Sequence, residues 1–243
     1  MEPLCRGRYR ARLADGPADV AAAQALRQRA FRGCAGRDSD AFDPRCDHML
    51  VEDVGSGCLV CCFRLLPIAR PEDIAASYSA QYYELSSLTS YGAPMVEMGR
   101  FCIAPGWKDP DILRIAWGAM AAYVDAHGSQ MLFGCSSFPG IKGEAYADAF
   151  AILQESHLAP KRWLPKVKAP QVFRFAERLR GRPDRRHGMR SMPPLLKSYL
   201  TMGGWVSDHA VIDRDLGTLH VFTGLEIAAI PAARKRLLRA VAG

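Results

Sequence analysis

An acid and a base stand inside an otherwise apolar stretch of the sequence. Residues 94–103 read as a β-strand in which Glu97 and Arg100 are flanked by Met95-Val96 and Phe101-Cys102-Ile103. Charged groups in a buried strand are costly unless they are paired or functional. Because they are three residues apart, they point to opposite faces of an ideal strand. The stretch therefore predicts a functional carboxylate and guanidinium, with structural pairing to other elements as the alternative.

Further acids, bases and aromatic residues precede this strand. They are Arg27 and Phe31 at i and i+4 on an expected helix, Asp43, Asp47 and His48 before an expected hairpin, and Arg64 within the apolar strand 59–66. Each alone is more often an ion-pair residue than a catalytic one. Carboxylates and imidazoles exchange protons, and guanidinium groups bind carboxylates through paired hydrogen bonds. Their recurrence indicates a polar site built from several elements.

Cys135 and Ser136 stand at the end of an expected strand, in the run Gly134-Cys135-Ser136-Ser137. A nucleophile can occupy such a place, but the G-x-S-x-G pattern is absent and no helix begins directly afterwards. We therefore expect this strand end to line a pocket, with a covalent role for either residue as the alternative.

Other familiar motifs are incomplete. Cys58, Cys61 and Cys62 contain a C-x-x-C, but no second Cys or His pair has the spacing of a zinc site, so they read as core residues. Neither G-x-x-x-x-G-K nor G-x-G-x-x-G occurs, which argues against nucleotide hydrolysis and dinucleotide binding. We expect no metal ion and no cofactor held by the protein itself.

The hydrophobic periodicity predicts alternating strands and helices. The expected strands are 9–14, 47–54, 57–68, 94–105, 130–138, 205–212 and 218–225. The expected helices are 17–32, 109–127, 144–157, 195–202 and 231–241, with 71–87 partly helical. This order predicts an α/β (α+β) fold in which a mixed central sheet is flanked by helices. We expect a core at 1–160 and a basic extension at 161–243 packed on it, as a single domain overall.

The net charge of +7 is unevenly distributed. Residues 161–243 contain 17 Lys and Arg against 6 Asp and Glu, so the first 160 residues are net negative. A basic region favours an anionic partner such as nucleic acid, an acidic protein or an anionic membrane surface. The stretch Arg178–Arg190 motivates the nucleic-acid alternative but lacks interleaved aromatic residues, so no nucleic acid is expected. No secretory signal, spanning segment or regular disulfide framework is apparent, which predicts a cytoplasmic protein.

Taken in order, the singled-out residues resemble a series found in acyl-homoserine-lactone (autoinducer) synthases. They resemble more closely the bacterial ornithine N-acyltransferases of ornithine-lipid synthesis, a hemolysin-like group. The series is Leu26-Arg27-x-x-x-Phe31, Phe42-Asp43, Cys46-Asp47-His48-Met49-Leu50-Val51, Arg64-Leu65-Leu66-Pro67, Glu97-Met98-Gly99-Arg100-Phe101 and the tail from Pro193 to Asp213. The resemblance spans residues 9–225. Autoinducer synthases carry a tryptophan soon after the residue matching Phe31, and residues 33–40 have none, which favours amide over lactone formation.

The resemblance implies a GNAT-like fold and transfer of a (3-hydroxy)fatty acyl group from acyl carrier protein to the α-amine of ornithine. The product would be a lyso-ornithine lipid, and the donor would carry its own phosphopantetheine arm. The turn 104–109 suits the pyrophosphate of coenzyme A poorly, as a carrier-protein donor predicts. The basic tail suits an acidic carrier protein, and an anionic inner-membrane face is a second target, which implies a peripheral location. The alternatives are another acceptor (lysine, glutamine or tyrosine), an autoinducer synthase, or a basic nucleic-acid or membrane-binding protein.

This interpretation gives each residue an expected role. An α-amine is protonated at neutral pH and must lose a proton before it attacks a thioester, so Glu97 is the expected base, with Asp47 and His48 as alternatives. The expected substrate-binding residues are Arg27, Phe31, Asp43, Arg64, Arg100, Phe101, Cys135 and Ser136. The arginines would bind the acceptor carboxylate or orient the acids, and Asp43 would receive the acceptor's side-chain ammonium. Backbone N–H groups where strands 94–103 and 130–138 separate would hold the pantetheine.

Overall fold

The computed structural model describes residues 1–179 and 182–242. The chain divides into two compact units. Unit 1 contains Met1–Pro67, Val96–Ser129 and the described residues from Pro231 on, and unit 2 contains Ile68–Met95 and the described residues of Gln130–Ile230. The expected boundary near residue 160 stays a prediction. Two residues of the Arg178–Arg190 stretch, Arg180 and Gly181, and Gly243 of the expected extension, lie outside the described residues.

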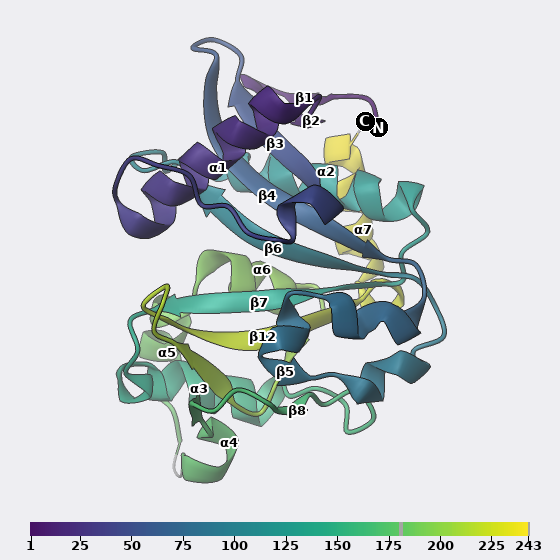
Figure 1. The fold of residues 1–243 in the computed structure, drawn as a ribbon. Coiled ribbons are helices and arrows are strands. Elements are labelled where there is room, and N and C mark those ends of the chain that lie inside the picture. The colour runs from purple at the N-terminus through teal and green to yellow at the C-terminus, as the bar shows by residue number, and fades with distance from the viewer. Residues whose placement is uncertain (180–181, 243) are drawn as a thin grey trace. The chain divides into compact units, whose positions relative to one another are not determined.

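Unit 1 is built on a sheet whose strand order is β1-β2-β3-β4-β6 (Figure 1). Its strands are β1 Leu4–Arg6, β2 Tyr9–Leu13, β3 Asp47–Asp53, β4 Cys58–Ile68 and β6 Met95–Ile103. The pairs β1–β2, β2–β3 and β3–β4 are antiparallel, so the expected hairpin of β3 and β4 forms. β1 is an additional edge strand that the sequence did not suggest.

Helices cover both faces of this sheet. They are α1 Pro17–Arg32 on one face, α2 Pro110–Ala126 on the other and α7 Ala232–Ala242, which packs on α2. Leu26 of α1 packs with Leu50 and Cys62. Tyr123 of α2 contacts Asp47, which alternation places on the opposite face of β3 from His48 and Leu50.

The bounds of α1 agree with the expected range because both ends carry strong signals. Pro17 occupies the first turn, where its missing N–H costs nothing. Gly33 adopts the left-handed conformation (φ 67°, ψ 14°), and its N–H donates to the Arg29 carbonyl. At the start of α2, the Asp109 carboxylate accepts from the Asp111 N–H at 2.9 Å.

Unit 2 contains an antiparallel sheet in the order β7-β12-β11-β9, with β10 also paired to β12. Its strands are β7 Met131–Pro139, β9 Val172–Phe173, β10 Trp205–Val206, β11 Ala210–Asp213 and β12 Thr218–Glu226, and β5 Tyr83–Glu84 pairs separately with β8 Lys166–Val167. Its helices are α3 Ala147–Ser156, α4 Phe175–Arg178, α5 Arg185–Ser191 and α6 Pro194–Thr201. The ambiguous region after β4 forms short 3-10 helices at Pro71–Ala76, Ser79–Gln81 and Ser86–Ser90.

The expected strand 205–212 is two strands, because Ser207 interrupts it. The Ser207 hydroxyl donates to the His209 carbonyl at 2.7 Å and accepts from the Phe222 N–H at 3.1 Å. This side chain therefore substitutes for part of the backbone ladder and bends the chain between β10 and β11. No helix in the described part of the chain is long and apolar enough to cross a membrane.

A Gly188→Ala variant is expected to be destabilised by about 1–3 kcal/mol, because α5 packs against α3 through Gly188. An added Cβ would lie 2.6 Å from Ile152 Cδ1 and 2.8 Å from the Asp148 carbonyl atoms. Urea unfolding measures the change. The control is Gly55→Ala, whose Cβ would meet only Asp53 Oδ1, at 3.7 Å. Equal stability of the two variants would contradict this packing.

Candidate active site

Arg27 lies at the centre of a buried ion-pair network in unit 1. Its side chain is 1% exposed, and its Nε–H donates to Asp38 Oδ2 at 3.0 Å. Its terminal N–H groups donate to both Asp43 oxygens, at 2.9 and 2.8 Å, and to the Asp38 carbonyl. Protein groups therefore engage this guanidinium, which fixes the positions of the two carboxylates.

Arg64 and Arg100 extend the network to a third carboxylate, Asp40. Arg64 donates to both Asp40 oxygens, at 2.6 and 2.8 Å, and to Asp43 Oδ1 at 2.7 Å. Arg100 donates to Asp38 at 2.9 Å and to Asp40 at 3.1 Å. Opposite charges thus alternate around the network, which offsets the cost of burying them.

The carboxylates of Asp40 and Asp43 stay ionised in this environment. Burial alone would raise both pKa values, but the guanidinium of Arg64 holds the pKa of Asp40 below its usual range, and Arg27 with Arg64 does so for Asp43. The Asp40 side chain is 23% exposed, against 4% for Asp43. Asp40 and Arg100, which is 12% exposed, are therefore the members that a ligand reaches most easily.

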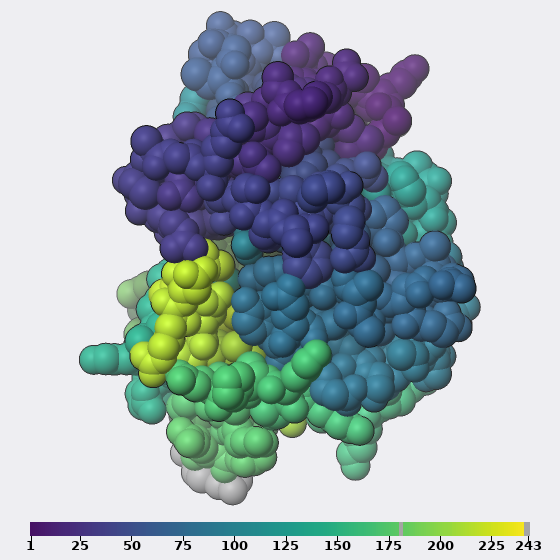
Figure 2. All heavy atoms as spheres, viewed as in Figure 1, coloured from purple at the N-terminus to yellow at the C-terminus, as the bar shows by residue number. Residues whose placement is uncertain are grey.

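Asp38 and Asp40, which the sequence did not single out, lie in the segment between α1 and β3. This segment covers part of unit 1 in Figure 2. It is held by the Asp38 N–H, which donates to the Gln24 carbonyl at 3.1 Å, and by Phe42, whose ring lies 5.6 Å from the Arg64 guanidinium carbon. The only available signal was the Asp-Ser-Asp spacing, which does not identify arginine partners far away in the chain.

The expectation that Glu97 and Arg100 face opposite sides of their strand is wrong, because β6 is not an ideal strand. Arg100 adopts φ 54°, a left-handed conformation that costs a non-glycine residue about 1–3 kcal/mol. A Cβ on Gly99 would lie 3.6 Å from Arg64 Nε, so residues 99 and 100 both face the network. Glu97, two residues before Gly99, shares this face by alternation.

The electrostatics agree with this placement of Glu97. Its side chain is buried at 4% exposure. Burial raises the pKa of the Cys46 thiol to about 12, and the charge of Glu97 adds to the rise. This influence indicates that Glu97 lies near Cys46, the residue before β3. Glu97 is therefore on the side of the sheet that the segment between α1 and β3 covers.

Phe31 and Phe101 lie on opposite faces of the sheet. Phe31 packs against the cluster of Ala23, Leu26, Leu50, Cys62 and Cys102 under α1. Phe101 stacks on Phe63, with ring centroids 5.5 Å apart and planes 23° apart. Phe31 therefore helps to pack α1, the helix that carries Arg27, against the sheet. Phe101 holds β6 in place through its contact with β4 on the face opposite the network.

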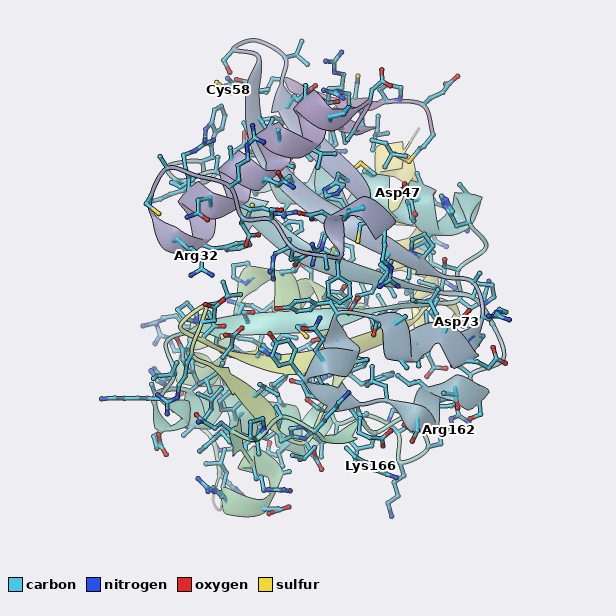
Figure 3. The ribbon with its side chains drawn as sticks, viewed as in Figure 1. Arg32, Asp47, Cys58, Asp73, Arg162 and Lys166 are labelled. Carbon is cyan, nitrogen blue, oxygen red and sulfur yellow. The ribbon has the colours of Figure 1, made fainter. Side chains whose placement is uncertain are left out.

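His48 and Asp47 also separate, because neighbouring strand residues alternate. His48 Nε2 lies 3.1 Å from the Asp43 carbonyl, and burial lowers the pKa of His48. Asp47 accepts a hydrogen bond from the Tyr123 hydroxyl at 2.5 Å; burial, and then this bond, raise the pKa of Tyr123. Figure 3 labels Asp47 at the start of β3. His48 thus lies on the network side of the sheet with Glu97, and Asp47 lies on the α2 side.

Cys135 and Ser136 belong to unit 2 and face opposite sides of β7. Cys135 Sγ lies 3.4 Å from Ser79 Oγ, and Cys135 pairs in register with Phe222 of β12. Ser136 accepts a hydrogen bond from the Thr223 hydroxyl at 2.9 Å, and both of these side chains are buried. Of these two residues only Cys135, which is half-buried, can line a surface.

The Cys135 side of unit 2 contains a buried polar cluster of Tyr83, His209 and His220. The Tyr83 hydroxyl donates to the His220 carbonyl at 2.7 Å and lies 3.2 Å from His220 Nδ1. His209 Nδ1 lies 2.6 Å from Asp208 Oδ1. Burial lowers the pKa of His220 to about 4, so its ring is neutral at pH 7.

The stability of the protein is expected to fall by about 3 kcal/mol between pH 6.5 and pH 4 because of His220. The unfolded histidine titrates near pH 6.5 and the folded one at about 4, so in this window only the unfolded state takes up the proton. Urea unfolding across the window measures the slope. His220→Asn should reduce that slope, and an unchanged slope would contradict the buried neutral ring.

Known proteins resemble this chain in sequence and in fold. A family model described as an acetyltransferase (GNAT) domain matches residues 23–118. An N-acyl amino acid synthase from uncultured soil microbes superimposes with a TM-score of 0.53 over 91% of this chain and 93% of that one, at 11% identity. The GNAT-like α/β fold expected from the sequence is thereby confirmed.

Relatives at higher identity define the family. The L-ornithine N(alpha)-acyltransferase of Rhodobacter capsulatus is 32% identical over 91% of each chain. The enzyme of the same name from Rhizobium meliloti is 31% identical over 90% of this chain and 80% of its own. Similarity of this extent includes both units and the segments that carry the network. The chain therefore belongs to the L-ornithine N(alpha)-acyltransferase family, as its ordered acids and arginines predicted.

Proposed function

We propose that this protein transfers a fatty acyl group from the thioester of an acyl carrier protein to the α-amino group of ornithine. The observation that carries the proposal is the placement of Glu97 and Arg100 on one face of β6, beside the carboxylates of Asp38 and Asp40. The names of the relatives support ornithine as the acceptor. The product would be a lyso-ornithine lipid, with a 3-hydroxyacyl chain as the group transferred.

In this mechanism Glu97 removes a proton from the α-ammonium group, directly or through one water molecule. The free amine attacks the thioester carbonyl carbon, so the C–N bond forms while the C–S bond breaks. The attacking nitrogen gives up its second proton as the amide forms, and the departing thiolate takes up one proton to become the free thiol of the phosphopantetheine arm. Direct attack requires no covalent enzyme intermediate, so Cys135 has no nucleophilic role in this scheme.

The acceptor is held by the more exposed members of the network. Arg100 would bind the acceptor carboxylate, because a guanidinium matches the geometry of a carboxylate. Asp40 is better suited than Asp43 to the side-chain ammonium, because its side chain is 23% exposed against 4% for Asp43. Arg27 and Arg64 are then positioning residues that hold the carboxylates in place.

Exposed basic residues would serve the donor and the product. Lys166, which points away from the ribbon in Figure 3, and the neighbouring Lys161 and Arg162 offer unit 2 as a partner for an acidic carrier protein. On α7, the exposed Leu237 directly follows the exposed Arg236 and lies three residues after the exposed Arg234, which suits an anionic membrane face. Co-sedimentation with lipid vesicles tests the membrane partner. Binding that does not increase with the fraction of anionic lipid would exclude an anionic membrane face.

Mass spectrometry of lipids from cells expressing the protein tests the acceptor. The expected product is an amide-linked acyl chain on an ornithine headgroup, and a lysine, glutamine or tyrosine headgroup would overturn the assignment. The purified protein should use acyl carrier protein thioesters at least tenfold better than coenzyme A thioesters of the same chain. Equal use of both donors would remove the carrier protein from the proposal.

A further inference from the structure

Positive charge without compensating acids gathers around α5 in unit 2. Three exposed arginines of this region form no ion pair with another described residue: Arg182, Arg186 and Arg190. Their neighbour Arg185 is instead paired with Glu155 at 2.7 Å, and α5 itself contains no acidic residue. Neighbouring like charges of this kind create a positive surface potential, which attracts an anionic partner.

The packing of α5 on α3 determines which of its side chains point outward (Figure 1). Gly188 is buried at the contact, where an added Cβ would lie 2.6 Å from Ile152 Cδ1. Successive helical residues are about 100° apart, so Arg186 and Arg190, two positions before and after Gly188, each lie about 160° from it. Both arginines are exposed, as this geometry requires. They therefore point away from α3.

Met189 lies beside these two arginines and reaches solvent as well. The residue is 42% exposed, although methionine is usually buried. It follows Arg186 by three residues and directly precedes Arg190, and residues three apart are neighbours on a helix surface. Arg186, Met189 and Arg190 thus form an outward face of α5, in which an apolar side chain is set among guanidinium groups.

Two acids close to α5 are used at its start. Asp184 accepts from the His187 N–H at 3.0 Å. Asp148 of α3 accepts from the Asp184 N–H at 2.9 Å, and its other oxygen lies 2.8 Å from His187 Nδ1. These contacts hold the beginning of α5 to α3. The outward face is therefore presented on a helix whose orientation is fixed.

The combination of arginine and methionine suits the surface of an anionic bilayer. Guanidinium groups bind phosphate oxygens through paired hydrogen bonds, and an apolar side chain beside them can enter the boundary between headgroups and acyl chains. Clusters of about four to eight Lys and Arg are typical of such surfaces, and residues 182–190 contain four arginines. Nucleic acid suits this stretch less well, because it offers no Phe, Tyr or Trp for base stacking.

We propose that the outward face of α5 binds the headgroups of an anionic membrane, with the Met189 side chain inserted between lipids. The reason for such a contact rests on the proposed function, because a fatty acyl amino acid is more stable in a bilayer than in water. The surface lies within unit 2 and is separate from α7, which belongs to unit 1.

The test is co-sedimentation of the full-length protein with phosphatidylcholine vesicles, with and without phosphatidylglycerol. A Leu237→Ser background removes the apolar side chain that α7 would insert, so that the remaining affinity reports on α5. We expect binding to require phosphatidylglycerol. Adding Arg186→Ala and Arg190→Ala should weaken it about thirtyfold, which is about fivefold for each arginine. Met189→Ser should weaken it about fivefold without changing its salt dependence.

The matched control is the double variant Arg29→Ala/Lys142→Ala in the same background. Both residues are exposed, neither forms an ion pair with another described residue, and the change removes the same two charges. Vesicle binding should stay within about twofold of the background, because exposed charges more than a Debye length from the bilayer are screened. An equal loss in the two double variants would show that only net charge matters, which would overturn the inference.

An acidic protein is the competing partner for this face. If the α5 variants bind vesicles as the background does but bind acyl carrier protein more weakly, the inference is overturned. The vesicle assay contains no substrate, so its result does not depend on turnover. If vesicles bind through α5 but ornithine is not acylated, only the proposed function fails. If ornithine is acylated but vesicles do not bind through α5, only this inference fails.

Discussion

A Glu97→Gln variant is expected to lose about 10²-fold or more in kcat while retaining its fold. Gln has nearly the same shape as Glu but cannot take a proton from the α-ammonium group. The position is buried on the network side of β6, so the isosteric change leaves its packing intact. Steady-state turnover with saturating ornithine measures the loss, and thermal unfolding checks the fold.

The matched control for Glu97 is Glu84→Gln in β5. Its side chain is 38% exposed and lies 3.9 Å from Lys166, outside the network, so activity should stay close to wild type. Near-wild-type turnover of Glu97→Gln would remove Glu97 from the role of base. If Cys135→Ala were inactive while Glu97→Gln worked, transfer through an acyl-cysteine would replace direct attack.

An Asp43→Asn variant is expected to unfold with a free energy about 3–5 kcal/mol below wild type. Asp43 accepts hydrogen bonds from Arg27, Arg64 and Gln24, and its carboxylate is almost fully buried. Asparagine leaves both guanidinium groups short of a counter-charge and turns an amide N–H toward one of them. The midpoint and slope of urea unfolding measure the change.

The control for Asp43 is Asp73→Asn, which breaks the exposed pair of Asp73 with Arg70. Such pairs contribute about 0.5 kcal/mol or less. A loss at Asp43 no larger than the loss at Asp73 would contradict the idea that the network is held together by buried charge.

The elements of the fold were readable from the sequence where local signals were strong. α1 was predicted at both ends because Pro17 and Gly33 act through their own backbone geometry. The break after β10 was not predicted, because it depends on a hydrogen bond that the Ser207 hydroxyl accepts from the distant Phe222 N–H. Local chemistry fixes helix ends, whereas strand interruptions depend on partners elsewhere in the chain.

The site was only partly predictable for the same reason. Arg64 and Arg100 stood out because charge is unusual in apolar segments, and Arg27 because it shares a helix face with Phe31. Their partners Asp38 and Asp40 lie in a polar segment where acids are ordinary. Glu97 and Arg100 were expected on opposite faces of the strand because no sequence feature indicates a left-handed backbone conformation at Arg100.

The discontinuous composition of unit 1 has a consequence for biosynthesis. α7 packs on α2, yet about a hundred residues of unit 2 separate the two helices along the chain. A ribosome adds about 5–20 residues per second. The helix α7 is therefore synthesised roughly 5–20 s after α2, and during this time the α2 surface that α7 contacts stays exposed. A nascent chain paused in that interval exposes apolar surface, which makes it a natural client for chaperones during translation.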